Sequence, residues 1–292
     1  MAKQYRPNPF RSIIEEVEKT KQPIPHQDLE TNEYRLAFTD AEFLLRDELR
    51  PVRLQLELLR PELILRDKEI DKTIVFFGSA RLPYRDQALE ALKIAEENLS
   101  QAPNDSKLIK AKDSAEKVYD NSKYLDEAVK LASISSIDKD LPFVVVTGGG
   151  PSVMEAANRG AQEVNAPSIA LNMMLPDEQV PNSFVTPELT FQFHYFAIRK
   201  MHFLMRAQAL VAFPGGYGTL DELFEVLTLM QTEKIVKIPL LLFNERFWRN
   251  VVNFEGLVEE GTISAEDINL IKYVETAEEA WDHIKNFYKE NG

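Results

Sequence analysis

The chain has 292 residues, 44% hydrophobic and 28% charged, which is ordinary for a globular protein with one large α/β domain. The formal net charge of −13 argues against general nucleic-acid binding, because clustered Lys and Arg hold a phosphate backbone, although backbone amides and one or two arginines can still bind a small anion. A sequence without cysteine excludes disulfides, thiolate nucleophiles and zinc–cysteine clusters.

Hydropathy and the first residues indicate a soluble protein of the cytoplasm. No apolar run approaches the length that crosses a bilayer. The opening segment, Met1 to Pro7, contains early charges and a proline where a secretory signal needs an unbroken apolar stretch. We therefore expect neither membrane association nor export.

Residues 1–72 are expected to form an N-terminal helical arm. Prolines there are mixed with charge-rich helical stretches such as residues 41–49. Apolar residues recur at mixed spacings of three and four, as on an amphipathic helix that packs on the main domain or on another subunit. These residues are Phe43, Leu44, Leu54, Leu56, Leu58 and Leu59.

From residue 73 the pattern changes to strands that alternate with helices. Strands are predicted at 73–77, 143–146, 168–172, 189–193, 209–213, 239–243 and 272–274, and helices at 86–99, 107–134, 152–160, 195–208, 219–231, 245–258 and 277–290. Residues 86–138 are interpreted as a helical insertion or a lengthened crossover with a solvated, charged face. The alternation predicts a Rossmann-like, doubly wound, mostly parallel sheet flanked by helices over residues 73–292.

Ligands of open parallel sheets bind beyond the carboxyl ends of the strands, which directs attention to three loops, 78–81, 148–152 and 214–219. The glycines at 148–150 lead into a helix, so their amides can converge on a phosphate, or they can serve only a tight turn. Their spacing is not the dinucleotide fingerprint, because Val153 occupies the position of the third glycine and no acidic residue lies about 20 positions further on. NAD is therefore not expected as a cofactor.

The third loop, Pro214 to Thr219, places three glycines and a hydroxyl between a strand and a helix, so backbone amides and a side chain can bind one ligand. Glu222 and Glu225 follow on one face of the helix, near the positive end of its dipole. A carboxylate there stays ionised and suits a base, a nucleophile or a cation stabiliser; helix capping is the alternative.

The remaining polar candidates are fewer. Arg199 and Lys200 on the preceding helix can reach the strand ends and bind a phosphate or orient a carboxylate, or they form a solvent-facing pair. The histidines show no metal-ligand spacing, so no metal is expected. They are His26, His194, His202 and His283. Serine hydrolase and P-loop chemistry are excluded by the lack of a G-x-S-x-G or Walker motif.

Taken together, Gly148–Gly150, Arg199–Lys200 and Pro214–Glu222 resemble the LOG ("lonely guy") family, whose hallmark is P-G-G-x-G-T-x-x-E. The resemblance covers about residues 73–260. It implies a phosphoribohydrolase that releases a free base and ribose 5-phosphate from AMP or a cytokinin riboside 5′-monophosphate. Many members were once labelled lysine decarboxylases, but no residue pattern here supports pyridoxal phosphate chemistry, and no cofactor is expected.

The resemblance implies that Arg199 and Glu222 are the catalytic pair. The residues expected to bind substrate and phosphate are Gly78, Ser79, Gly149, Gly150, Lys200, Gly215, Gly216, Gly218, Thr219 and, as a reserve carboxylate, Glu225. The family's R-K-x-x-M segment has Phe203 at its last position here, and the arm and the 86–138 helices exceed compact members, which leaves base preference and oligomer type open. Compact members are dimers that share the active site, so a homo-oligomer is expected.

The expected chemistry passes through an oxocarbenium-like sugar, which requires an ionised carboxylate near the anomeric carbon. Glu222 can stabilise the cation, activate water or attack directly. Backbone amides would anchor the phosphate and orient the reacting bond. Two alternatives remain: a nucleotide or cofactor carrier of the same broad fold that binds without turnover, as molybdenum-cofactor carriers do, and an assembly factor that acts through the arm.

Overall fold

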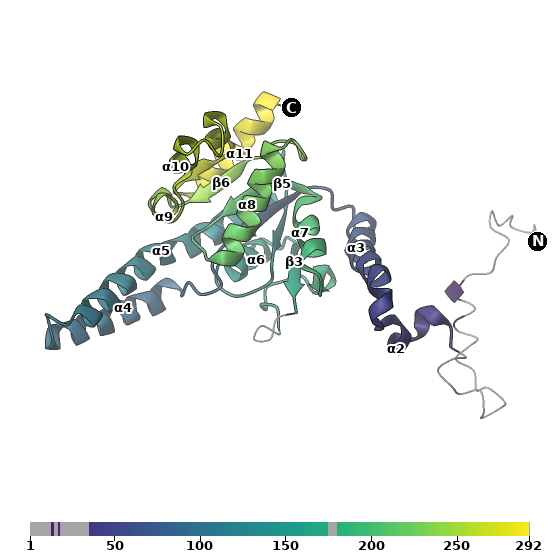
Figure 1. The fold of residues 1–292 in the computed structure, drawn as a ribbon, viewed down its shortest axis with the longest axis horizontal. Helices are drawn as coiled ribbons and strands as arrows, with labels where there is room; N and C mark the ends of the chain where they lie inside the picture. Colours follow the sequence, from purple (N-terminus) through teal and green to yellow (C-terminus); the bar gives the residue numbers. More distant parts are fainter. Residues whose placement is uncertain (1–12, 15–16, 18–34, 175–179, 292) are drawn as a thin grey trace, which may run out of the picture. The chain divides into compact units, whose positions relative to one another are not determined.

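The computed structural model describes residues 13–14, 17, 35–174 and 180–291, so most of residues 1–34 of the predicted arm, His26 among them, lies outside the described residues (Figure 1). Within this part of the chain, seven strands form one sheet in the order β4-β3-β2-β1-β5-β6-β7, and all neighbouring strands are parallel. The strands are β1 (Thr73–Phe77), β2 (Val144–Thr147), β3 (Ser168–Met173), β4 (Thr190–Phe193), β5 (Ala207–Ala212), β6 (Leu240–Phe243) and β7 (Lys272–Val274). The predicted doubly wound α/β sheet is confirmed.

Helices connect these strands and cover both faces of the sheet (Figure 1). They are α4 (Arg85–Gln101), α5 (Ser106–Ile137), α6 (Val153–Glu163), α7 (Phe196–Leu204), α8 (Tyr217–Gln231), α9 (Glu245–Val251), α10 (Phe254–Glu259) and α11 (Ala277–Asn291), with 3-10 turns η5 (Pro187–Leu189) and η6 (Ala265–Leu270). No helix in the described ranges is both long and apolar enough to span a bilayer.

The core has two layers because successive residues of a strand point to opposite faces. In β1, Val75 and Phe77 pack in a cluster with residues of α7 and α8, whereas Ile74 and Phe76 pack in a second cluster with residues of α5, α6 and α11. All five residues of β1 are buried. A central strand buried on both faces explains its continuous apolar sequence.

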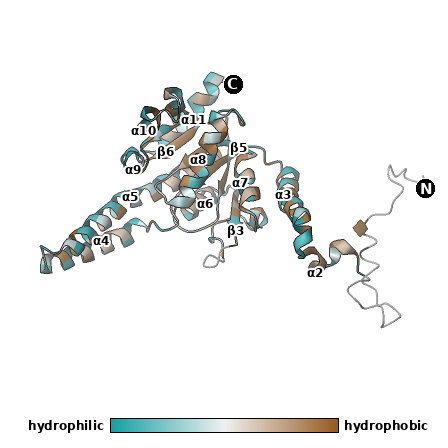
Figure 2. Cartoon of the chain, viewed as in Figure 1, coloured by the Kyte–Doolittle hydropathy of each residue, from teal (hydrophilic) through white to brown (hydrophobic). Residues whose placement is uncertain are grey.

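Helix α5 is the crossover between β1 and β2, and its two halves have different surroundings. Its second half is buried on α6 and the sheet, through residues such as Leu125, Ala128 and Leu131. Its first half pairs with α4 in a hairpin that extends away from the sheet (Figure 1). Figure 2 shows this hairpin as mainly hydrophilic and the strands as hydrophobic. The predicted charged, solvated face therefore belongs to the hairpin.

Two predicted helices differ from the structure. The helix predicted at 245–258 is two helices, α9 and α10, because the Asn253 side chain accepts a hydrogen bond from the Gly256 amide and starts a new helix there. The helix predicted at 195–208 ends at Leu204, because β5 already begins at Ala207 to pair with β1.

The chain divides into two compact units, Met1–Gln55 and Leu56–Gly292. In the first unit lie η3 (Ala37–Thr39), α2 (Ala41–Leu44), η4 (Asp47–Leu49) and the start of α3 (Arg50–Asp67). Asp40 caps α2 by accepting a hydrogen bond from the Phe43 amide. The division of the chain at residue 72 stays a prediction.

In the second unit, the rest of α3 is fixed to the sheet by polar contacts. The Glu57 carboxylate accepts hydrogen bonds from the amides of His194 and Tyr195 at the start of α7. Glu62 forms an ion pair with Arg206, the residue that precedes β5.

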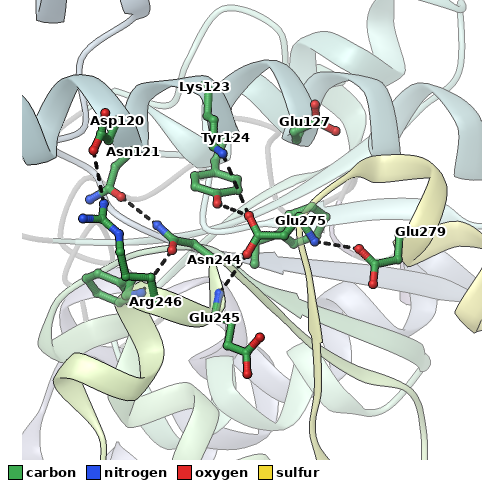
Figure 3. A network of polar contacts seen from close by, with 12 residues as sticks. Asp120, Asn121, Lys123, Tyr124, Glu127, Asn244, Glu245, Arg246, Glu275 and Glu279 are labelled. Carbon is green, nitrogen blue, oxygen red and sulfur yellow. Dashed lines mark hydrogen bonds and ion pairs between the residues drawn. The ribbon is translucent and has the colours of Figure 1, made fainter.

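A second polar network lies at the carboxyl ends of β6 and β7 and joins them to α5 (Figure 3). The Tyr124 hydroxyl donates to Glu275, whose other oxygen accepts a hydrogen bond from the Glu245 amide at 3.1 Å. Asn244, which caps α9 from a left-handed backbone conformation, donates to Asn121 at 2.8 Å. These contacts hold the crossover helix against the end of the sheet.

Candidate active site

The strand order reverses between β1 and β5, and two of the three predicted loops, 78–81 and 214–219, meet there. From β1 the chain proceeds outward to β4, then returns to the other side of β1 as β5. Ligands of doubly wound sheets bind in the crevice at such a reversal. The Ser79 amide donates to the Pro214 carbonyl at 3.1 Å, and the Phe213 amide donates to the Phe77 carbonyl at 2.8 Å. The loops after β1 and β5 are therefore in direct contact.

A cavity of about 750 Å³ opens beside these two loops, within the range of small-molecule sites. Eight of the predicted site residues line it: Gly78, Ser79, Arg199, Gly215, Gly216, Gly218, Thr219 and Glu222. The other lining residues are Phe76, Phe77, Ala80, Arg81, Gly148, Met154, Asn172, Met173, Phe203, Tyr217, Leu220, Phe247 and Val251. The cavity thus combines a polar floor with apolar and aromatic walls.

The N-terminus of α8 forms the polar floor of the cavity. The helix starts at Gly216 as its N-cap, without a side-chain cap, and continues for 15 residues. A β-carbon on Gly216 or Gly218 would meet no atom within 4 Å, so the space in front of these residues is open. Backbone amides at the positive end of a helix dipole suit a phosphate group.

Glu222 lies on the second turn of α8 and is only 6% exposed. Burial raises the pKa of its carboxyl to about 7, although the charges of Lys200 and Arg199 oppose this effect. Its Oε1 atom lies 3.6 Å from Nη2 of Arg199. A carboxyl with this pKa exchanges its proton near neutral pH, as catalytic carboxylates often do.

Arg199 comes from α7 and is held by aromatic rings as well as by charge. Its guanidinium carbon lies 5.1 Å from the ring centre of Phe196 and 5.6 Å from that of Phe203. Cation–π contacts of this kind restrict the guanidinium and keep it beside Glu222. The structure therefore brings the predicted catalytic pair together at one wall of the cavity.

Lys200 and Glu225 do not line the cavity. The Lys200 ammonium lies 2.9 Å from Asp221 Oδ2 and 2.8 Å from Glu225 Oε2, with Glu222 Oε2 further away at 3.9 Å. The two predicted binding residues therefore pair with each other across the contact between α7 and α8.

Gly149 and Gly150 are not among the residues that line the cavity, although their neighbour Gly148 lines it. The Gly149 amide donates to Thr147 Oγ1 at 2.9 Å, and its carbonyl accepts from the Asn182 amide at 2.8 Å. The Gly150 carbonyl accepts from the Asn182 side chain. These backbone groups of Gly149 and Gly150 therefore form hydrogen bonds with Thr147 and Asn182.

Several cavity residues were not predicted as site residues from the sequence. Asn172 and Met173 end β3, and Phe247 and Val251 lie on α9. Two of the unpredicted residues have a detectable signal: Asn172 is a polar side chain near the carboxyl end of an apolar strand, and Arg81 lies in the loop 78–81 after the first strand. Among residues with described positions, no group of three or more His, Asp or Glu side chains is placed to hold a metal ion.

Comparisons with known proteins support part of this picture. The family model described as "Possible lysine decarboxylase" matches residues 154–284. The chain is 32% identical over 172 residues to the cytokinin riboside 5′-monophosphate phosphoribohydrolase LOG3 of Arabidopsis thaliana, a match that covers 57% of this chain and 76% of that protein. It is 36% identical over 90 residues to the probable cytokinin riboside 5′-monophosphate phosphoribohydrolase LOGL3 of Oryza sativa subsp. japonica, covering 30% of this chain.

The extent of these matches differs between relatives. The chain spans 43% of the rice protein and 42% of the Arabidopsis thaliana protein LOG1, less than half of each. Among solved structures, the molybdenum cofactor binding protein from Rippkaea orientalis is similar with a TM-score of 0.44 and 16% identity, over 74% of this chain and 98% of that one.

Proposed function

Because this chain belongs to the LOG family, we propose that it hydrolyses the N-glycosidic bond of a nucleoside 5′-monophosphate, AMP or a cytokinin riboside 5′-monophosphate, and releases the free base and ribose 5-phosphate. The observation that carries the proposal is the pairing of Glu222 with Arg199 in the cavity that the N-terminus of α8 also lines. A phosphate site alone does not require a buried carboxylate beside it.

In the proposed reaction, the phosphate binds to the amides at the start of α8, and this anchors the ribose near Glu222. The bond between the anomeric carbon and the base nitrogen breaks, and a water oxygen bonds to that carbon. One water proton leaves with the base nitrogen. Positive charge develops on the sugar, so an ionised carboxylate lowers the barrier by stabilising the cation, by activating the water or by direct attack.

Arg199 contributes to this step in two ways. Its positive charge favours the ionised form of Glu222 against the effect of burial. Its planar guanidinium, held between Phe196 and Phe203, fixes the direction of the carboxylate. The apolar walls of the cavity offer a surface for a flat base.

The test is chromatographic detection of the free base after incubation of the purified chain with AMP and with cytokinin riboside 5′-monophosphates. The matching nucleosides, which lack the phosphate, are the substrate control and should react far more slowly. Glu222→Gln should lower kcat by about 100-fold or more, because it removes the charge at the reacting centre. Glu259→Gln, which changes an exposed carboxylate at the end of α10, is the matched control.

Two outcomes would contradict the proposal. Full activity of Glu222→Gln would remove the carboxylate from the mechanism. Tight binding of a nucleotide by the wild-type protein without any base release would favour a carrier.

A further inference from the structure

Three carboxylates stand within little more than one turn of α8, and they face different surroundings. Glu222 lines the cavity and is buried. Asp221 is largely exposed, with 57% of its side chain accessible, and Glu225 is partly buried on the side of α7. The negative charges of Asp221 and Glu225 repel that of Glu222 and make the Glu222 carboxyl harder to ionise.

The ammonium group of Lys200 is directed at the two outer carboxylates. It lies within hydrogen-bond distance of both Asp221 and Glu225, and about 1 Å further from Glu222. Its side chain is 16% exposed, which is low for a lysine. These two ion pairs hold the Lys200 ammonium at Asp221 and Glu225 and so oppose its rotation toward a ligand in the cavity.

We propose that Lys200 is a positioning residue for Glu222. By binding Asp221 and Glu225 it holds α7 against α8, compensates the two neighbouring negative charges, and leaves the Glu222 carboxylate directed at Arg199 and the cavity. The effect of Lys200 on turnover rests on the proposed hydrolase activity. Its effect on the pKa of Glu222 can be measured without any substrate.

The charges around Glu222 agree with this assignment. From α7, Lys200 and Arg199 favour the ionised carboxylate; from α8, Glu225 and Asp221 oppose it, as does burial, which is the largest cause. The loop after β1 adds Arg81 to the cavity wall, and the lining residues of α9 are apolar. Loss of Lys200 would leave two uncompensated carboxylates beside Glu222 and would raise the pKa of Glu222 above its present value near 7.

This role differs measurably from phosphate binding by Lys200. A lysine that binds the phosphate would, when removed, raise KM for nucleotides at every pH, because a contact with the substrate is lost. A lysine that positions Glu222 would, when removed, lower kcat most strongly at low pH. Its removal would change KM little, because the groups that line the cavity remain.

The first experiment follows the ionisation of Glu222 without any substrate. Protein labelled with ¹³C at the glutamate side-chain carboxyl is titrated by NMR, and the Glu222 signal is identified by its absence in Glu222→Gln. Lys200→Met should raise the titration midpoint by about one pH unit or more, since an opposite charge at this distance is removed. Lys200→Arg keeps the positive charge, so the titration midpoint of Glu222 should stay close to the wild-type value. Lys112→Met, which removes a lysine paired with Glu116 on α5, should not change it.

Glu225→Gln provides a second, independent variant if Lys200→Met does not fold. It removes a like charge and leaves Lys200 free to approach Glu222, so the midpoint should fall. Equal midpoints in wild-type protein, Lys200→Met and Glu225→Gln would overturn the proposal; if Lys200→Met cannot be prepared, an unchanged midpoint in Glu225→Gln is enough to do so.

The second experiment measures base release from the preferred nucleotide across pH. Lys200→Met should lose about tenfold in kcat/KM at pH 6, because one pH unit changes the ionised fraction tenfold, and much less at pH 9. A rise in KM with an unshifted pH profile would overturn the proposal and assign Lys200 to phosphate binding. If the wild-type protein releases no base while the NMR midpoints shift as expected, the hydrolase proposal fails and the positioning role of Lys200 stands.

Discussion

Gly215 approaches Thr219 so closely that a β-carbon on Gly215 would lie 2.1 Å from the Thr219 hydroxyl oxygen. Gly215→Ala should therefore displace the first turn of α8 and destabilise the protein by about 1–3 kcal/mol, as overpacking does. Thermal melting checks this effect. Gly216→Ala is the matched variant, because its added methyl group meets no atom within 4 Å and should leave the melting temperature almost unchanged. A similar loss in both variants would contradict the packing argument.

The same two variants separate packing from binding. The methyl group of Gly216→Ala would occupy open space at the cavity floor, so we expect weaker nucleotide binding without a loss of stability. Isothermal titration with AMP measures this, with Glu222→Gln present in both proteins compared so that the nucleotide is not hydrolysed. Unchanged affinity in Gly216→Ala would show that the ligand does not approach this part of the helix.

The pH dependence of the reaction should report Glu222. Its pKa of about 7 means that the carboxyl is mostly neutral at pH 6 and mostly ionised at pH 8. Because the proposed mechanism needs the ionised form, kcat/KM should fall as pH decreases through about 7, by about tenfold for each pH unit below it. A profile that stays flat down to pH 5 would show that another group limits the reaction.

Stability should change with pH in the opposite direction to activity. Between the ordinary value of 4.5 and about 7, the native protein keeps the Glu222 proton that the unfolded chain has lost, so the free energy of unfolding decreases as pH rises through this window. The full effect is on the order of 3 kcal/mol. Glu222→Gln removes it, so the variant should gain stability relative to wild type at pH 8 compared with pH 5, as melting curves at both values would show. An equal difference at the two pH values would contradict this prediction.

Helix α6 packs on α5 without room for a side chain at Gly160. A β-carbon there would lie 2.1 Å from the Val129 carbonyl oxygen, a backbone atom that cannot move aside easily. Gly160→Ala should cost about 1–3 kcal/mol even though alanine favours the helix. Gln162→Ala, at an exposed position of the same helix, should change stability little, and urea unfolding of both variants provides the measurement.

The network at the ends of β6 and β7 should contribute to stability and not to turnover. Tyr124 is buried and donates its hydroxyl to Glu275 (Figure 3). Tyr124→Phe should cost about 1.5–3 kcal/mol, the range for a hydrogen bond to a charged group. Tyr119→Phe on the same helix removes an exposed contact with Arg85 and should cost less than about 1 kcal/mol. Loss of base release by Tyr124→Phe at a temperature where it is folded would indicate a link to the active site.

Much of the fold could be predicted because the strands carry a local signal. The predicted strands are short apolar runs, and three of them, β1, β2 and β5, are followed within two residues by glycine or proline. Each predicted strand lies within two residues of an observed one. The break between α9 and α10 also had a local signal, since Asn253 is a strong N-cap residue. Asn253 lies inside a pattern that is otherwise typical of one helix, so the sequence predicted a single helix over 245–258.

The site was predictable only in part, because its geometry depends on packing. The meeting of Arg199 and Glu222 requires α7 to lie beside α8, and the same packing turns the adjacent Lys200 toward Asp221. Neighbouring residues of a helix point in different directions, so a sequence motif cannot say which of the two faces the cavity. The place of Asn172 in the wall likewise depends on the strand order, which has no local signature.

The hydrogen bond from Ser79 to Pro214 joins two loops that are separated in the chain by β2, β3 and β4. During synthesis, β1 therefore emerges long before the strand that completes its other side. A nascent chain that ends before β5 has the loop after β1, but it has neither the loop after β5 nor Glu222. Closing so long a segment is slow and entropically costly. The proposed nucleotide binding should consequently arise in a single late step of folding, which would make ligand binding a direct measure of how much newly made protein has completed its sheet.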